Sequence, residues 1–89
     1  MAYSIELSRD AERQIGRFRP ALHLRISAAI DALRLDPRPT GVRKLSGFAN
    51  RWRIRVGDYR IVYEIHDSQL LVIIIEVGHR SDIYRSSAR

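Results

Sequence analysis

Arginines that could hold a phosphate alternate along two short runs, residues 51–56 and 59–64, which a Gly-Asp dipeptide joins. A two-residue loop between alternating runs is a strong signal for a β-hairpin, and alternation sends successive side chains to opposite faces. The predicted register places Arg55 directly opposite Arg60. Because like charges in that relationship repel, the sequence predicts an anion between them, and we expect that anion to be a phosphate.

The same register divides the predicted hairpin into two faces. The apolar face, which we expect to pack in the core, pairs Val56 with Tyr59, Ile54 with Ile61 and Trp52 with Tyr63. The other face, here named the arginine face, pairs Arg55 with Arg60, Arg53 with Val62 and Arg51 with Glu64. The chemistry of the hairpin is therefore expected on the arginine face.

Positive charge is clustered in this part of the sequence. The chain has a net charge of +6, and the segment 38–60 alone holds seven basic residues and one acidic residue, Asp58. Lys44 is the only lysine, and arginine is the residue better suited to bidentate contacts with phosphate. A solvated charged face is the simplest alternative. Clustering on predicted strands favours a nucleic acid, an acidic partner, or both.

The rest of the sequence predicts the elements that position this hairpin. Residues 3–7 alternate as a short strand, Ser8 is a good helix N-cap, and Pro20 stands where a second helix would begin. Residues 70–77 are the most apolar run and predict a central strand covered on both faces, which Gly78 ends. The order β-α-α-β-β-β indicates an α+β fold, with a small, largely antiparallel sheet and an N-terminal helical hairpin packed on one face.

Length and composition limit the class of protein. The 89 residues predict one domain, 1–89, with one small core. The chain has no cysteine, no apolar run of about 18 residues and no signal-peptide pattern, so we expect a cytoplasmic protein that does not enter the membrane. Three scattered histidines, His23, His66 and His79, give no metal-ligand spacing. Neither a metal nor another cofactor is expected.

Four fragments of the sequence, in this order and spacing, resemble the RelE/ParE toxin superfamily. They are residues 43–47 (RKLSG), 52–55 (WRIR), 57–63 (GDYRIVY) and 77–84 (VGHRSDIY). The last fragment is more similar to the RelE branch, the mRNA interferase toxins of type II toxin–antitoxin systems. The resemblance implies a RelE-like fold and a ribosome-dependent endonuclease that cuts mRNA in the A site. In that reaction the 2′-OH of a nucleotide attacks the adjacent phosphate, and a cognate antitoxin blocks the toxin.

The resemblance also implies functional positions. They are a basic pair on the second strand, an arginine on the third, an arginine after the fourth and a tyrosine near the C-terminus, here Arg53, Arg55, Arg60, Arg80 and Tyr84. The strand arginines would stabilise charge on the phosphate. Arg80 would protonate or neutralise the leaving 5′-oxygen, and Tyr84 would orient the 2′-OH or stack on a base. We also expect three neighbouring basic residues to bind RNA, namely Arg43, Lys44 and Arg51.

The general base is the open point of this chemistry. The best-known RelE toxins carry lysine at the basic pair, where this chain has Arg53 and Arg55. A lysine can lose its proton near neutral pH, whereas arginine keeps it. His79 could replace the missing lysine, because histidine titrates near neutral pH, or it could be structural. The structural alternatives are a salt bridge with a nearby carboxylate for Arg80 and an anchor for the C-terminal segment for Tyr84.

The sequence leaves a second class of function open. A ParE-like toxin has the same fold but inhibits DNA gyrase, and a catalytically weak relative would act mainly as the antitoxin's partner in an autorepressor complex. For the endonuclease, the expected partners are the ribosome, mRNA and an acidic antitoxin, with operator DNA contacted only through the toxin–antitoxin complex. The codon preference, the antitoxin's identity and the stoichiometry of the complex do not follow from the sequence.

Overall fold

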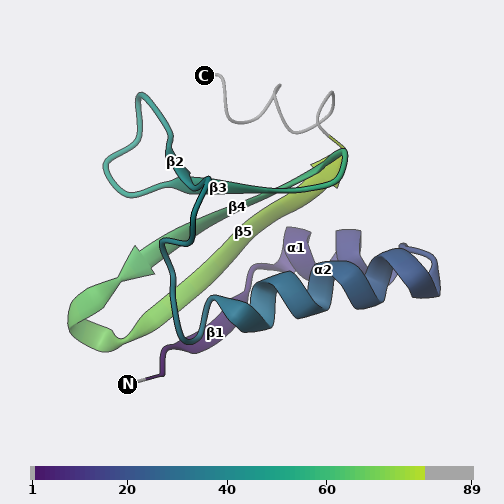
Figure 1. Cartoon of the computed structure of the whole chain (residues 1–89), viewed down its shortest axis with the longest axis horizontal. Helices are drawn as coiled ribbons and strands as arrows, with labels where there is room; N and C mark the ends of the chain where they lie inside the picture. The colour runs from purple at the N-terminus through teal and green to yellow at the C-terminus, as the bar shows by residue number, and fades with distance from the viewer. Residues whose placement is uncertain (1, 80–89) are drawn as a thin grey trace.

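Five strands form one sheet, and both helices cover one of its faces (Figure 1). The computed structural model describes residues 2–79 of the chain. Its elements are β1 (Ser4–Leu7), α1 (Arg9–Gly16), α2 (Pro20–Ala32), β2 (Arg43–Lys44), β3 (Trp52–Val56), β4 (Tyr59–His66) and β5 (Leu71–His79), with a 3-10 turn, η1, at Asp67–Gln69. The order in the sheet is β1-β5-β4-β3-β2. β1 and β5 are parallel and the other neighbours are antiparallel, so the predicted α+β fold is confirmed.

The two helices begin where the sequence predicts. The Ser8 side chain accepts a hydrogen bond from the backbone NH of Ala11 at 3.0 Å, which caps α1. Pro20 is the first residue of α2, where the missing NH costs nothing. Neither of the helices that the structure describes is long and apolar enough to cross a membrane.

The core lies between the helices and the face of the sheet that they cover. The helices contribute Ala11, Ile15, Ile26 and Ile30, and the sheet contributes Ile54, Ile61, Tyr63, Ile65, Val72, Ile74 and Val77. The predicted apolar face of the hairpin therefore does pack in the core. The Tyr63 hydroxyl is buried and donates a hydrogen bond to the carbonyl of Pro37 at 2.7 Å. Burial of this hydroxyl raises the pKa of Tyr63 well above its usual range.

β5 differs from its prediction in two ways. The strand begins at Leu71, because Leu70 adopts a left-handed conformation with φ 48°, and it continues through Gly78 to His79. Its core-side residues Val72 and Ile74 are buried, but Ile73 is only half-buried on the face away from the helices. The prediction of a strand covered on both faces is therefore wrong, because the helices cover β5 on one face. The middle position of the sheet belongs to β4.

A β-bulge interrupts the pairing of β4 with β5. Val62 pairs with Glu76 and Tyr63 pairs with Ile74, so Ile75 is an extra residue on β5. Ser8 is hydrogen-bonded to this irregular backbone. Its hydroxyl donates to the carbonyl of Ile75 at 2.6 Å, and its backbone NH donates to the carbonyl of Ile74 at 2.8 Å. The residue that caps α1 therefore also holds the bulge.

Candidate nucleic-acid interface

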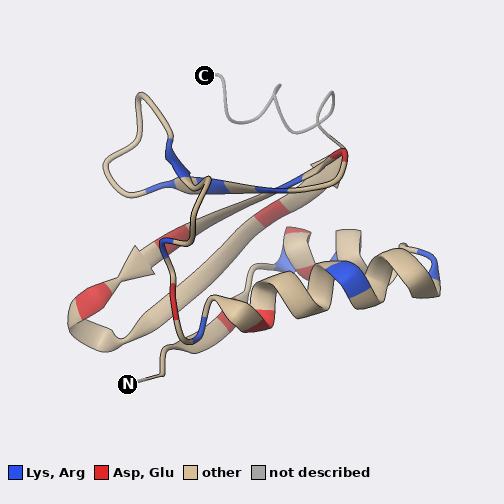
Figure 2. Ribbon diagram, viewed as in Figure 1, with Lys and Arg blue, Asp and Glu red and all other residues tan. Residues whose placement is uncertain are grey.

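The hairpin between β3 and β4 has the register that the sequence predicts. Arg55 pairs with Arg60 and Arg53 pairs with Val62. Gly57 takes the first loop position with φ 61°, which a residue with a side chain rarely adopts. Because paired residues project from the same side of a sheet, the arginines of the two strands share the face that the helices leave uncovered. Figure 2 shows positive charge along β2 and β3, away from the helices.

The neighbouring strands extend the arginine face. On one side, Arg43 of β2 pairs with Arg53, so it joins the same face. On the other side, Gly78 of β5 pairs with Arg60 and Glu76 pairs with Val62. Basic residues thus occupy two neighbouring rows of the sheet, Arg43 with Arg53 and Arg55 with Arg60, and Gly78, which has no side chain, lies beside Arg60.

Arg60 is the buried member of this group, with 5% of its surface exposed, whereas Arg55 is exposed. A buried guanidinium keeps its proton, since an arginine cannot be deprotonated in a protein. Electrostatic interactions are also stronger where water is excluded. Arg60 is therefore a permanent positive charge held within the sheet, directly opposite the exposed Arg55.

Glu64 lies at one end of the arginine face. Its carboxylate lies 3.7 Å from the Nε atom of Arg51 and 3.0 Å from the Nε2 atom of His66. The predicted facing of Arg51 and Glu64 is therefore confirmed, although Arg51 precedes β3. The Arg51 guanidinium also lies 4.6 Å from the centre of the Phe48 ring. These contacts hold Arg51 at the edge of the face, next to the loop that joins β2 and β3.

Lys44 lies on the opposite side of the sheet from Arg43. It pairs with Trp52, which belongs to the core side, and its ammonium is 5.7 Å from the centre of the Trp52 ring. The two residues are consecutive in β2, so their side chains point to opposite faces. The structure brings Arg43 together with the strand arginines and does not bring Lys44 to them.

Sequence reasoning missed a polar cluster beside Trp52. The Arg38 guanidinium lies 4.9 Å from the ring centre and donates hydrogen bonds to both carboxylate oxygens of Asp67, at 3.3 and 2.9 Å. The Tyr3 hydroxyl donates to the same carboxylate at 2.6 Å. The hydrogen bonds from Arg38 and Tyr3 lower the pKa of Asp67 to about 2. No local signal could have revealed this cluster, because its members are far apart in the sequence.

His79 lies on the helix side of the sheet, not on the arginine face. It pairs with Tyr59 at the end of β5, and the two rings meet edge to face with centroids 5.6 Å apart. The bulge at Ile75 is the reason. Regular alternation from Val72 and Ile74 would send His79 to the arginine face, and one extra residue reverses this.

The described arginine face combines its cations with two carboxylates, Glu64 and Glu76, and its histidine lies far from Arg60. His66 is the histidine on this face among the described residues, and it stands six positions after Arg60 in β4, roughly 20 Å along the strand. It is also hydrogen-bonded to Glu64. Grouped arginines of this kind are the side chains that stabilise negative charge on a phosphate. The predicted site residues Arg80 and Tyr84 lie outside the described residues.

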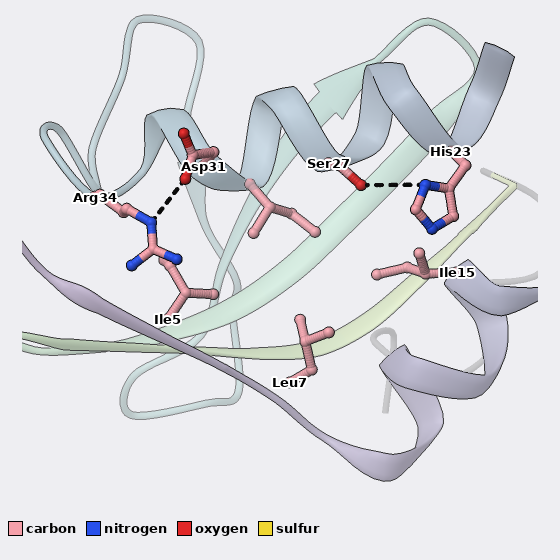
Figure 3. Close-up of a pocket in the computed structure, with 8 residues that line it drawn as sticks. Ile5, Leu7, Ile15, His23, Ser27, Asp31 and Arg34 are labelled. Carbon is pink, nitrogen blue, oxygen red and sulfur yellow. Dashed lines mark hydrogen bonds and ion pairs between the residues drawn. The ribbon is translucent and has the colours of Figure 1, made fainter. Parts of the chain in front are cut away.

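A separate cavity of about 320 Å³ lies between β1 and α2, on the helix side (Figure 3). Its apolar wall includes Leu7 and Ile15. Its polar groups are bonded to each other. Asp31 accepts a hydrogen bond from Arg34 at 2.7 Å, and Ser27 lies 3.4 Å from His23. The cavity contains none of the predicted site residues.

Comparison with known proteins agrees with the fold. Residues 5–84 match the family model described as the ParE toxin of type II toxin–antitoxin systems. Toxin RelG of Mycobacterium tuberculosis is 31% identical over 86 residues, covering 96% of this chain and 99% of RelG. Toxin RelE3 of Methanocaldococcus jannaschii is 32% identical over 76 residues, covering 85% of this chain and 84% of that protein.

A solved structure shows the same architecture. RelE in the RelE–RelB complex of Pyrococcus horikoshii superposes with a TM-score of 0.79 and 25% identity, covering 90% of this chain and 97% of RelE. The match to the family model spans most of the chain, and the relatives are RelE-type toxins. The chain therefore belongs to the ParE toxin family of type II toxin–antitoxin systems, within the RelE-like branch of the RelE/ParE superfamily.

Proposed function

We propose that this toxin is a ribosome-dependent mRNA endonuclease that cuts in the A site. The observation that carries the proposal is the direct pairing of Arg55 with Arg60 on the face of the sheet opposite the helices, extended by Arg53 and Arg43. A phosphate bound there would relieve the repulsion between the paired cations. The same cations would stabilise the extra negative charge that develops when a 2′-OH attacks the phosphate.

The proposed steps divide between the strands and the C-terminal segment. The strand arginines hold the scissile phosphate in line with the 2′-OH of the preceding nucleotide. As the P–O bond to the 5′-oxygen breaks, Arg80 neutralises the charge on that oxygen and water supplies its proton, leaving a 2′,3′-cyclic phosphate and a free 5′-OH. Tyr84 orients the 2′-OH or stacks on a base. Since His79 faces the helices, we assign removal of the 2′-OH proton to water or to the RNA itself.

A cognate antitoxin is the proposed controlling partner. RelE of P. horikoshii is bound to RelB in its crystal structure. A chain with a net charge of +6 favours an acidic partner that folds on binding. In this proposal the toxin acts in the cytoplasm, and it reaches operator DNA only as part of the toxin–antitoxin complex.

Primer extension on translated mRNA tests the proposal. Induction of the toxin should stop growth and produce cuts within reading frames, in phase with the codons, while purified toxin should leave naked RNA largely intact. Arg13→Gln serves as the control variant. Arg13 is an exposed residue of α1, which lies on the other side of the sheet from the arginine face, and it pairs with Asp10.

Gyrase inhibition is the second candidate, and the family model that matches the chain is that of ParE toxins. Arginine at the positions of the basic pair is compatible with it, because a gyrase inhibitor needs no general base. Growth arrest with uncut mRNA and inhibited supercoiling would support this candidate. Growth arrest with neither effect would contradict both.

A further inference from the structure

A small hollow on the helix side of the sheet is not used by the proposed reaction. It has a volume of about 250 Å³ and lies where the end of β5 meets α1 and the start of β4. Its lining residues are Gln14, Arg17, Phe18, Tyr59, Val77, Gly78 and His79. The hollow is smaller than the 300–1,000 Å³ typical of sites for drug-sized molecules. Its size suits a single ring system.

Three aromatic rings from three segments meet at this hollow. Phe18, just after α1, and Tyr59, at the start of β4, pack edge to face with ring centroids 5.4 Å apart. His79, at the end of β5, packs edge to face against the Tyr59 ring, with ring centroids 5.6 Å apart. Aromatic side chains are the groups on which unpaired bases of RNA stack, whatever the base.

Two polar side chains of the hollow complement a nucleotide, and one of them, Gln14, is fixed by a hydrogen bond. The side-chain oxygen of Gln14 accepts a hydrogen bond from the backbone NH of Val77 at 2.7 Å, so the amide NH2 remains as a donor at the wall. Arg17 brings a cation to the same wall. The Gln14 contact also ties α1 to β5 just beyond the bulge, so the hollow is preformed by the fold.

The surroundings of the hollow are basic. The segment 17–30 contains Arg17, Arg19 and Arg25 and no acidic residue, and the neighbouring hairpin loop contains one acidic residue, Asp58. The Arg25 guanidinium reaches the hairpin loop, 3.0 Å from the position that a Cβ atom on Gly57 would take. Negatively charged ligands are therefore attracted to the end of the molecule where the hollow opens.

We propose that this hollow is a binding site for one nucleotide of single-stranded RNA, with the base against Phe18 and His79 and the phosphate at Arg17. An apolar peptide side chain would pack against the aromatic rings but would offer no partner to the charge of Arg17 or to the Gln14 amide. A nucleotide can stack its base on the rings, accept a hydrogen bond from the amide and place its phosphate at Arg17. The site lies on the opposite side of the sheet from the arginine face, so it anchors RNA outside the cleavage centre. The proposal takes RNA as the ligand from the proposed function, but no step of cleavage depends on it.

Binding of nucleoside monophosphates tests the site directly, without ribosomes and without cleavage. AMP and UMP are titrated into the toxin and followed by the backbone amide NMR signals of the lining residues, with ribose 5-phosphate as the ligand that lacks a base. The site predicts saturable shifts centred on the hollow, and binding of ribose 5-phosphate at least about fivefold weaker. Equal binding of ribose 5-phosphate and AMP, or shifts confined to the arginine face, would overturn the proposal.

Two variants separate the base from the phosphate. Phe18→Leu keeps an apolar side chain but removes the ring, and it should weaken AMP binding by about 5- to 150-fold while leaving ribose 5-phosphate unaffected. Arg17→Gln should weaken both ligands. Arg13→Gln, which removes one positive charge that is paired with Asp10 and does not line the hollow, should weaken neither. Each variant is first checked for an intact amide spectrum. Equal AMP binding by wild type and a folded Phe18→Leu variant would exclude base stacking.

Crosslinking identifies the source of the RNA. Phe18 is replaced by photo-reactive benzoylphenylalanine, and the toxin is irradiated on ribosomes that carry a labelled message. An adduct with the message or with ribosomal RNA supports the proposal and names the source. Adducts with ribosomal proteins alone contradict it. Because nucleotide binding and cleavage are measured separately, failure of this site leaves the endonuclease proposal intact, and failure of cleavage leaves the site intact.

Discussion

Arg55 and Arg60 are direct partners across the β3–β4 hairpin, yet Arg55 is exposed and Arg60 is buried. The difference follows from the order of the strands. β4 is the middle strand, whereas β3 is followed only by β2, which has two residues, toward the edge of the sheet. The pair therefore combines a buried positive charge with an exposed one. In the proposed function both charges act on the same phosphate.

Arg55→Gln is expected to lower the rate of mRNA cleavage by on the order of 10²–10³, since it removes one cation from the developing charge. Because Arg55 is exposed, the free energy of unfolding should change by no more than about 0.5 kcal/mol. Cleavage is measured by primer extension in a translating lysate, and stability by urea denaturation. Full cleavage by a folded Arg55→Gln variant would remove Arg55 from the mechanism.

Arg55→Lys tests whether arginine limits proton transfer. A lysine at this position keeps the positive charge but can lose its proton when crowded by other cations. We expect faster single-turnover cleavage, with a rate that increases with pH. Arg55→Gln is the matched control, as it has no proton to exchange in this range. A rate for Arg55→Lys equal to or below that of the wild type would show that the base step is not limited by arginine.

His79→Gln is expected to leave the shape of the pH–rate profile unchanged, because His79 faces the helices and not the arginine face. Single-turnover rates on the ribosome are measured at several pH values for the wild type and the variant, and each profile is scaled to its maximum. Loss of a rise with pH in the range where histidine titrates would show that His79 accepts the 2′-OH proton after all.

Asp67→Asn is expected to destabilise the protein in a pH-dependent way. Hydrogen bonds from Arg38 and Tyr3 lower the pKa of Asp67 from its ordinary value of 3.8 to about 2. The ionised carboxylate therefore stabilises the folded state, fully so above about pH 4, and this contribution is lost as the pH falls toward 2. Urea midpoints of the wild type and the variant should differ at pH 6 and converge near pH 2. A difference that does not depend on pH would assign the effect to packing rather than to charge.

Ser8→Ala is expected to reduce the free energy of unfolding by about 1–3 kcal/mol. The substitution removes the cap of α1, which is worth about 1 kcal/mol, and leaves the Ile75 carbonyl at the bulge without the donor that Ser8 provides. Ser8→Thr keeps a hydroxyl and is the control. Urea denaturation gives the stability, and the NMR signals of Val77 and His79 report whether the bulge persists. An unchanged midpoint for Ser8→Ala would contradict this dual role.

The sequence by itself determined the features that depend on neighbouring residues. The alternation around the Gly-Asp loop determined the pairing of Arg55 with Arg60, because a two-residue loop allows one register and strict alternation then assigns each face. Ser8 and Pro20 determined where the helices begin, because capping acts within one turn. The family resemblance also depended on local sequence, namely the four fragments 43–47, 52–55, 57–63 and 77–84.

Tertiary structure decided what depends on strands that are distant in the sequence. The burial of Arg60 follows from the middle position of β4, and the cluster of Tyr3, Arg38 and Asp67 joins three separate segments. The face on which His79 lies is the clearest case. Regular alternation along β5 would place His79 on the arginine face. The extra residue Ile75, whose carbonyl accepts a hydrogen bond from Ser8, reverses the alternation and places His79 on the helix side. A bulge has no local signature in an apolar run, because its position is set by the partner strand and by the groups that satisfy its backbone.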